Sequence, residues 1–170
     1  MICTLDANAI ISWSDPKCDP LILARLELLF ESVHKARGVI ILPTPALAEL
    51  LVLTNNATAD WLNTLQKRSS VRIAPFDLKA ATECALIHRL ADDRGGKRKG
   101  TKKGEAYQKI KVDRQIAAIA RVHQSDLIVT NDENLEAISK FIGLHSLRIE
   151  QLDTPESAKQ TTIFALEEQA

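Results

Sequence analysis

Short runs of apolar residues alternate along the chain with longer stretches in which apolar residues recur every three or four positions. The short runs predict β-strands, and the stretches with helical spacing predict helices. Strands are expected at residues 2–5, 39–42, 71–73, 127–130 and 147–149. Helices are expected from residue 6 for a short stretch, at 21–37, 44–53, 59–65, 78–90 and 112–123, and up to residue 138 after the fourth strand.

The predicted strands are continuous apolar runs rather than alternations of apolar and polar residues. This pattern is typical of a parallel sheet whose two faces are both covered by helices. The sequence therefore predicts an α/β protein, a three-layer α/β/α fold with a central parallel sheet. In such sheets the functional crevice lies outside the carboxyl ends of the strands, where the strand order reverses. Residues that directly follow a strand are thus the first functional candidates.

Length and composition limit the class of protein further. The 170 residues, 45% hydrophobic and 26% charged, suffice for one globular domain with one core. No apolar run reaches the roughly 18 residues of a membrane span, and no secretory signal is visible. The three cysteines, Cys3, Cys18 and Cys84, are odd in number and match no zinc pattern. We expect reduced thiols in a cytoplasmic protein with no membrane association.

The net charge is zero, but the charge is unevenly spread. Residues 94–111 hold eight basic residues and one acidic residue, whereas the rest of the chain holds 14 basic and 21 acidic residues. An acidic body with a basic segment suits a polyanionic substrate held over a cation site. The segment has no apolar periodicity and predicts an exposed, mobile loop. Its candidate RNA contacts are Lys97, Arg98, Lys99, Lys102 and Lys103.

Two carboxylates come after predicted strands. Asp6 directly follows residues 2–5, and Asp132 follows residues 127–130. Each has a structural alternative, since Asp is a common helix N-cap and Thr130 with Glu133 has the spacing of a capping box.

Two further carboxylates lie on predicted helices. The residues three and four positions from Glu49 on either side are all apolar, and an ion on an apolar stripe is costly unless something pairs with it. Asp113 lies in the first turn of the helix predicted at 112–123, at the end of its apolar face. Alternatively, Asp113 is a first-turn acid favoured by the helix dipole and paired with Lys109.

Together these four acids predict a cation site. Carboxylates at one end of one sheet repel one another and raise each other's pKa. Mg²⁺ or Mn²⁺ relieves this repulsion, and both ions prefer oxygen ligands. No Ser or Cys nucleophile with a partner His is apparent, and the four histidines match no H-E-x-x-H pattern.

Four segments in this order resemble the PIN-domain nucleases, and most of all the VapC-type toxins of bacterial toxin–antitoxin pairs. They are Leu-Asp-Ala-Asn-Ala-Ile-Ile at 5–11, Pro-Ala-Leu-Ala-Glu-Leu at 45–50, Asp-Arg-Gln-Ile-Ala-Ala-Ile-Ala at 113–120 and Leu-Ile-Val-Thr-Asn-Asp at 127–132. The resemblance implies an endoribonuclease that cuts RNA with Mg²⁺ or Mn²⁺. It implies metal ligation and catalysis by Asp6, Glu49, Asp113 and Asp132, with Asn8 and Thr130 supporting the site by hydrogen bonding.

The resemblance also implies a domain layout and partners. It covers roughly residues 1–150, so we expect a PIN-like domain at 1–152 with a basic insertion at 94–111. Residues 153–170 are expected to form a C-terminal helix or tail, which, like the long basic loop, departs from the compact toxin pattern. The expected partners are RNA, an antitoxin protein and a second copy of the chain.

Two other functions compete with this interpretation. A phosphoryl-accepting receiver domain is also α/β with acids at strand ends, but it needs a lysine just after a late strand and gives Glu49 no role. A PIN fold used only as a nucleic-acid- or partner-binding module usually lacks one or more of the acids, whereas all four are present here.

Overall fold

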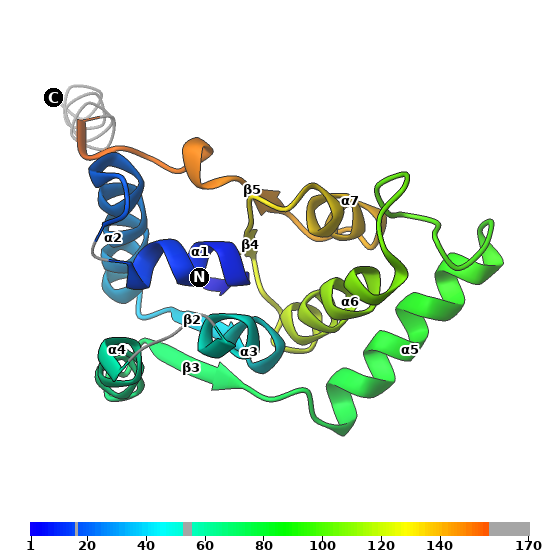
Figure 1. Cartoon of the computed structure of the whole chain (residues 1–170), viewed down its shortest axis with the longest axis horizontal. Helices are drawn as coiled ribbons and strands as arrows, with labels where there is room; N and C mark the ends of the chain where they lie inside the picture. Colours follow the sequence, from blue (N-terminus) through cyan, green and yellow to red (C-terminus); the bar gives the residue numbers. More distant parts are fainter. Residues whose placement is uncertain (16, 53–55, 157–170) are drawn as a thin grey trace, which may run out of the picture.

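The structure, a computed structural model, describes residues 1–15, 17–52 and 56–156, with the side chains of 56–59 excepted. Within these residues five strands form one parallel sheet in the order β3-β2-β1-β4-β5 (Figure 1). The strands are β1 (Ile2–Leu5), β2 (Val39–Pro43), β3 (Val71–Ala74), β4 (Leu127–Val129) and β5 (Ser146–Leu147). The predicted α/β fold with a central parallel sheet is confirmed.

The helices lie between the strands in sequence. They are α1 (Ala7–Ser14), α2 (Pro20–Lys35), α3 (Thr44–Val52), α4 (Asn56–Gln66), α5 (Leu78–Asp93), α6 (Tyr107–Val122) and α7 (Glu133–Phe141), followed by the 3-10 turn η1 (Ile149–Gln151). None of the helices in the described part of the chain is long and apolar enough to cross a membrane. The three cysteines are free, as predicted.

The two faces of the sheet are covered by different helices (Figure 1). Ile40 and Leu42 of β2 belong to a buried cluster that includes Phe30 of α2. Ile41, between them, packs instead with Ala80 of α5 and Ile119 of α6. Successive side chains of a strand point to opposite faces, so α2 covers one face while α5 and α6 cover the other. This arrangement is the predicted three-layer fold.

The order of the strands places a switch point beside β1. The chain adds β2 and then β3 on one side of β1, and later returns to add β4 and β5 on the other side. The reversal therefore falls between β1 and β4, and the crevice at their carboxyl ends is where α/β proteins of this kind bind ligands.

Several boundaries differ from the sequence prediction, and two of them change which residues are helical. Helix α6 begins at Tyr107 and not at residue 112, because Ile110 is fully buried and extends the apolar face of the helix by one turn. Lys109 and Lys111 are thus helical residues and not part of a loop. The last strand ends at Leu147, and Ile149 instead starts η1, with its N–H bonded to Asn131 Oδ1 at 3.0 Å.

The division into a domain at 1–152 and a tail at 153–170 stays a prediction. Most of the predicted tail, residues 157–170, lies outside the described residues.

Candidate active site

Asp6 lies at the carboxyl end of β1 and is the N-cap of α1. Its Oδ1 accepts the Ala9 N–H at 2.8 Å, and its Oδ2 accepts the hydroxyl of Thr130. The side chain is only 3% exposed. Burial raises the pKa of Asp6 to about 6, although its two hydrogen bonds oppose this, and the negative charges of Asp132 and Glu49 add to the rise. Asp6 is thus a helix N-cap, as the structural alternative predicts. Capping alone does not require a buried carboxylate, so its burial needs a further explanation.

Thr130 links the ends of the two central strands. It follows β4 directly and is 1% exposed. Its hydroxyl donates to Asp6 Oδ2 and accepts the backbone N–H of Asp132 at 2.9 Å. Thr130 therefore makes the hydrogen bonds that its predicted supporting role requires. Its importance for catalysis stays a prediction.

Asp132 is the N-cap of α7. Its Oδ1 accepts the backbone N–H groups of Asn134 and Leu135 at 2.7 and 3.0 Å, and its Oδ2 forms an ion pair with Lys109. Burial raises the pKa of Asp132, but the bond from Lys109 and those from the backbone outweigh it, so the pKa is lowered overall. The predicted capping box of Thr130 and Glu133 is wrong, because Asp132 itself caps the helix.

Asp113 approaches the strand ends from α6. Because that helix starts at Tyr107, Asp113 lies in its second turn, and the predicted first-turn position is wrong. The carboxyl group is 5% exposed, and its Oδ2 accepts the side-chain amide of Asn134 at 2.5 Å. Burial raises the pKa of Asp113 to about 7, with Asp132 and Glu49 adding to the rise while Asn134 and Lys109 oppose it.

Glu49 is exposed on α3, and the prediction that it lies on a buried apolar stripe is wrong. Ala46 of this helix is buried, but Val52 is 84% exposed, so the apolar residues around Glu49 do not all face the core. Its charge nevertheless raises the pKa of both Asp6 and Asp113, which places it within electrostatic reach of the other acids.

Asn8, expected to support the site, is exposed on α1. Its side chain has no hydrogen-bond partner in the described residues. The structure therefore brings Asp6, Asp113, Asp132 and Thr130 together, leaves Glu49 at the edge, and gives the Asn8 side chain no hydrogen bond to them within the described residues.

The acids fit a divalent cation by charge and by donor type. Within the described ranges no three His, Cys, Asp or Glu side chains are close enough together to hold a metal ion. Burial contributes most to the raised pKa values of Asp6 and Asp113, and the charges of Asp132 and Glu49 add to them. A cation relieves both effects, and carboxylate oxygens are the donors that Mg²⁺ and Mn²⁺ prefer.

A sequence profile of the PIN domain matches residues 3–141 of the chain. The chain belongs to the PIN-domain family. Among curated proteins none matches the chain.

Solved structures share the PIN fold. A chain of the VapBC2 complex of Rickettsia felis, bound to a DNA fragment from its promoter, superposes with a TM-score of 0.58 at 17% sequence identity, over 87% of this chain and 98% of that one. A chain of DNA-bound VapBC from Salmonella typhimurium superposes with a TM-score of 0.57 at 21% identity, over 88% of this chain and 98% of that one. At these identities the likeness shows the fold.

The basic segment lies inside the matched PIN region and is anchored to it. Arg114 of α6 is 1% exposed, and its guanidinium donates to the carbonyl oxygens of Lys97 and Lys99 at 2.9 and 3.2 Å and contacts His88 Nδ1 at 2.7 Å. The backbone N–H of Lys102 donates to Asn134 Oδ1 at 3.0 Å. These hydrogen bonds hold the backbone of the basic segment against α6 and α7, whereas its composition predicts a mobile loop.

The sequence analysis missed both anchoring residues of this PIN domain. Arg114 lies between the buried residues Asp113 and Ile116. A charged residue among apolar helix neighbours, the pattern that drew attention to Glu49, could have identified it. Asn134 follows Asp132 by two positions and had no distinguishing signal. The five basic residues proposed to contact RNA are all exposed: Lys97, Arg98, Lys99, Lys102 and Lys103.

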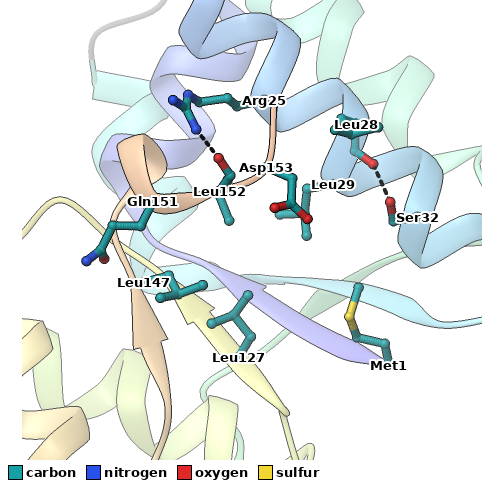
Figure 2. A pocket seen from close by; sticks show the side chains of 10 residues that line it. All are labelled: Met1, Arg25, Leu28, Leu29, Ser32, Leu127, Leu147, Gln151, Leu152 and Asp153. Carbon is teal, nitrogen blue, oxygen red and sulfur yellow. Dashed lines mark hydrogen bonds between the residues drawn. The ribbon is translucent and has the colours of Figure 1, made fainter. Parts of the chain in front are cut away.

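A separate, mostly apolar cavity of about 280 Å³ lies between α2 and the sheet (Figure 2). Met1 and Leu127, which line it, stand at the starts of β1 and β4, and Leu28 and Leu29 of α2 cover it. Arg25 donates a hydrogen bond to the carbonyl oxygen of Leu152 at its rim. None of the four acids lines this cavity, so it takes no part in the candidate site of the PIN domain.

Proposed function

We infer that this PIN-domain protein is a metal-dependent endoribonuclease that hydrolyses RNA phosphodiester bonds. The observation that carries the proposal is the gathering of Asp6, Asp113 and Asp132 at the switch point of the sheet. Asp6 and Asp113 are both buried there and both repelled by Asp132 and Glu49. A structural role explains a single N-cap, but it does not explain why two carboxylates are buried where the charges of two further acids reach both.

The residues of the proposed site have different roles. Asp6, Asp113 and Asp132 would hold Mg²⁺ or Mn²⁺, with Glu49 adding negative charge from the edge. A bound ion of this kind supplies Lewis acidity and lowers the pKa of a bound water. Thr130 fixes the carboxyl group of Asp6, and Asn134 that of Asp113. The proposed product carries a 5′-phosphate.

The test compares cleavage of an oligoribonucleotide by the wild type, Asp6→Asn and Asp113→Asn, with Mn²⁺ and with EDTA. Each substitution removes a ligand charge and little volume, so we expect folded proteins without activity, and no activity of the wild type in EDTA. Asp93→Asn, at an exposed position on α5, is the matched control. Full cleavage by folded Asp6→Asn in EDTA would overturn the mechanism.

We further infer that the protein is the toxin of a type II toxin–antitoxin pair. The support is the fold likeness to chains of two VapBC complexes. An antitoxin segment would lie across the acids and offer an Arg to them in place of the metal. A cytoplasmic location and a homodimer belong to the same proposal. Expression alone should arrest growth, and Asp6→Asn should relieve the arrest; harmless expression of an active enzyme would point to another RNA-processing role.

A second candidate, a PIN fold that binds nucleic acid or a protein without catalysis, is favoured by two observations. Lys109 neutralises Asp132, and no three acids in the described residues are close enough together to hold an ion. A thermal melt with and without Mn²⁺ separates the two functions, because only an intact cation site is stabilised by the ion.

A further inference from the structure

Lys109 places a positive charge of the chain itself among the acids. It lies on α6 four residues before Asp113, and residues with this spacing share one face of a helix. Its Nζ forms an ion pair with Asp132 Oδ2 and lies 3.6 Å from Glu105 Oε2. The candidate cation site thus already contains an ammonium group.

The two oxygens of Asp132 have different roles. Oδ1 accepts two backbone N–H groups and caps α7, whereas Oδ2 is paired with Lys109. Since Oδ1 is committed to the helix end, a divalent cation that binds Asp132 must take Oδ2. Binding of that cation therefore competes with the ion pair of Lys109, because both cations bind the same oxygen and repel each other.

Lys109 is able to leave Asp132 at little cost. Its side chain is 45% exposed, so the ammonium group is not trapped in the interior, and Glu105, which precedes the helix, offers a second carboxylate. Partly exposed ion pairs contribute little, whereas a divalent ion interacts with a carboxylate cluster through twice the charge.

We propose that Lys109 is a phosphate-binding residue that Asp132 holds while the site lacks metal and releases when a divalent cation takes Asp132 Oδ2. This inference rests on the proposed function for its substrate class. An ammonium group is a compact donor for phosphate oxygens, and the released side chain stays on the helix face that carries Asp113. The competing explanation is an ordinary surface ion pair that neither a metal nor a phosphate disturbs.

The first test measures the affinity for Mn²⁺ by calorimetry, without any nucleic acid. Removing the competing ammonium in Lys109→Met should tighten Mn²⁺ binding by about two- to fivefold, the worth of a partly exposed ion pair. Lys109→Arg should bind Mn²⁺ like the wild type. Lys111→Met is the matched control: it removes the same charge from the same helix, but its ammonium lies over the ring of Tyr107, 5.1 Å from the centroid.

Mn²⁺ binding by Lys109→Met that is no tighter than that by Lys111→Met would overturn the proposed competition. A melting curve in EDTA verifies that each variant is folded. Lys109→Gln, which keeps a polar end on the side chain, replaces Lys109→Met should that protein fail to fold.

The second test uses adenosine 5′-monophosphate, which carries the phosphate of the proposed product and has no bond for the enzyme to cut. With Mn²⁺ present, Lys109→Met should weaken its binding by about tenfold, as expected for a lost charge-assisted hydrogen bond, and Lys109→Arg should recover part of the affinity. In EDTA the wild type and Lys109→Met should bind it equally, because Lys109 is then engaged with Asp132. An equal loss in both conditions, or no loss with Mn²⁺, would overturn the proposal.

Neither measurement requires cleavage of RNA. A wild-type protein that cuts no RNA, but in which Lys109→Met shows both expected changes, would contradict the proposed ribonuclease activity and support the role of Lys109.

Discussion

The side-chain amide of Asn134 donates a 2.5 Å hydrogen bond to Oδ2 of Asp113. The carbonyl end of the same amide accepts the backbone N–H of Lys102 at 3.0 Å. Asn134 is 1% exposed, so one buried side chain joins an acid of the candidate site to the basic segment. The two features that the sequence suggests separately are thus physically connected.

Asn134→Leu should raise the pKa of Asp113 above its present value of about 7, because the lost hydrogen bond favours the charged carboxylate. The direct measurement is an NMR titration of the Asp113 carboxyl carbon in EDTA. Asn131→Leu is the control, since Asn131 bonds to Ile149 and Glu150 and to none of the four acids. An unchanged titration of Asp113 in folded Asn134→Leu would contradict this role of the amide.

The metal-free protein should lose stability as the pH rises from about 4 to about 7. Asp6 and Asp113 have pKa values of about 6 and about 7, above the 3.8 of an ordinary Asp. Folding therefore favours their protonated forms, and this contribution is full below pH 3.8 and lost as the pH passes through 6 and 7. The loss for Asp6 is on the order of 3 kcal/mol.

Thermal melting in EDTA across this pH range checks the prediction. Asp113→Asn should flatten the fall and melt higher than the wild type at pH 8, whereas Asp93→Asn should keep the wild-type dependence. Mn²⁺ should restore stability at high pH, where the carboxylates are charged. A metal-free wild type that is most stable at pH 8 would show that the two acids do not carry the predicted penalty.

Glu49→Gln should hardly change the melting temperature in EDTA, because Glu49 is exposed and most exposed substitutions have small effects. It should nevertheless reduce the stabilisation by Mn²⁺, since the charge of Glu49 acts on both Asp6 and Asp113. The measurement is the shift in melting temperature on adding Mn²⁺, with Glu31→Gln on the exposed side of α2 as control. Equal shifts for Glu49→Gln and the control would exclude Glu49 from the cation site.

The sequence is informative about Asp6 and Asp132 because both follow apolar strands, and a parallel sheet places the carboxyl ends of its strands at one edge. It is misleading about Glu49, because an apolar neighbour in sequence need not be buried, as Val52 shows at 84% exposure. The start of α6 was missed because Lys109 and Lys111 flank Ile110 and mask one turn of apolar periodicity.

Hydrogen bonds between distant segments cannot be predicted from local sequence patterns. Arg114 reaches Lys97 and Lys99, and Thr130 reaches Asp6 across 124 residues of sequence. No local pattern encodes such pairs, since they arise only when the sheet and α6 have come together. The fold and the strand-end acids are therefore predictable from the pattern of the chain, whereas the partners of those acids are not.

Arg114→Met should release the basic segment from α6. The carbonyl oxygens of Lys97 and Lys99 lose their donors, and a buried group left without its partner costs about 1–3 kcal/mol. We expect faster amide hydrogen exchange and faster proteolysis confined to residues 94–106, with the pKa of Asp113 unchanged. Arg121→Met is the control. It removes an exposed Arg from the same helix, α6, where Arg121 pairs with Glu83 of α5. Equal proteolysis of the two variants would show that Arg114 does not anchor the segment.

The five basic residues of the segment should contribute unequally to RNA binding. Lys102 is paired with Glu133, and Arg98 donates to the carbonyl oxygen of Glu105. The side chains of Lys97, Lys99 and Lys103 have no ion pair within the described residues. A cation that is already paired must give up its partner before it contacts phosphate, so the unpaired lysines should release most of the counterions when RNA binds.

The slope of log binding constant against log salt for a single-stranded oligoribonucleotide measures this release. With Lys97, Lys99 and Lys103 replaced by Ser, the slope should become shallower by about two, or 0.7 for each lost phosphate contact. Replacing Arg98 and Lys102 should change it less, and both variants should keep the Mn²⁺ affinity of the wild type. An unchanged slope in the triple variant would mean that the segment touches no phosphates. A larger change in the double variant would mean that RNA breaks the ion pair of Lys102 with Glu133 and the hydrogen bond from Arg98 to Glu105. The order of contributions would then be reversed.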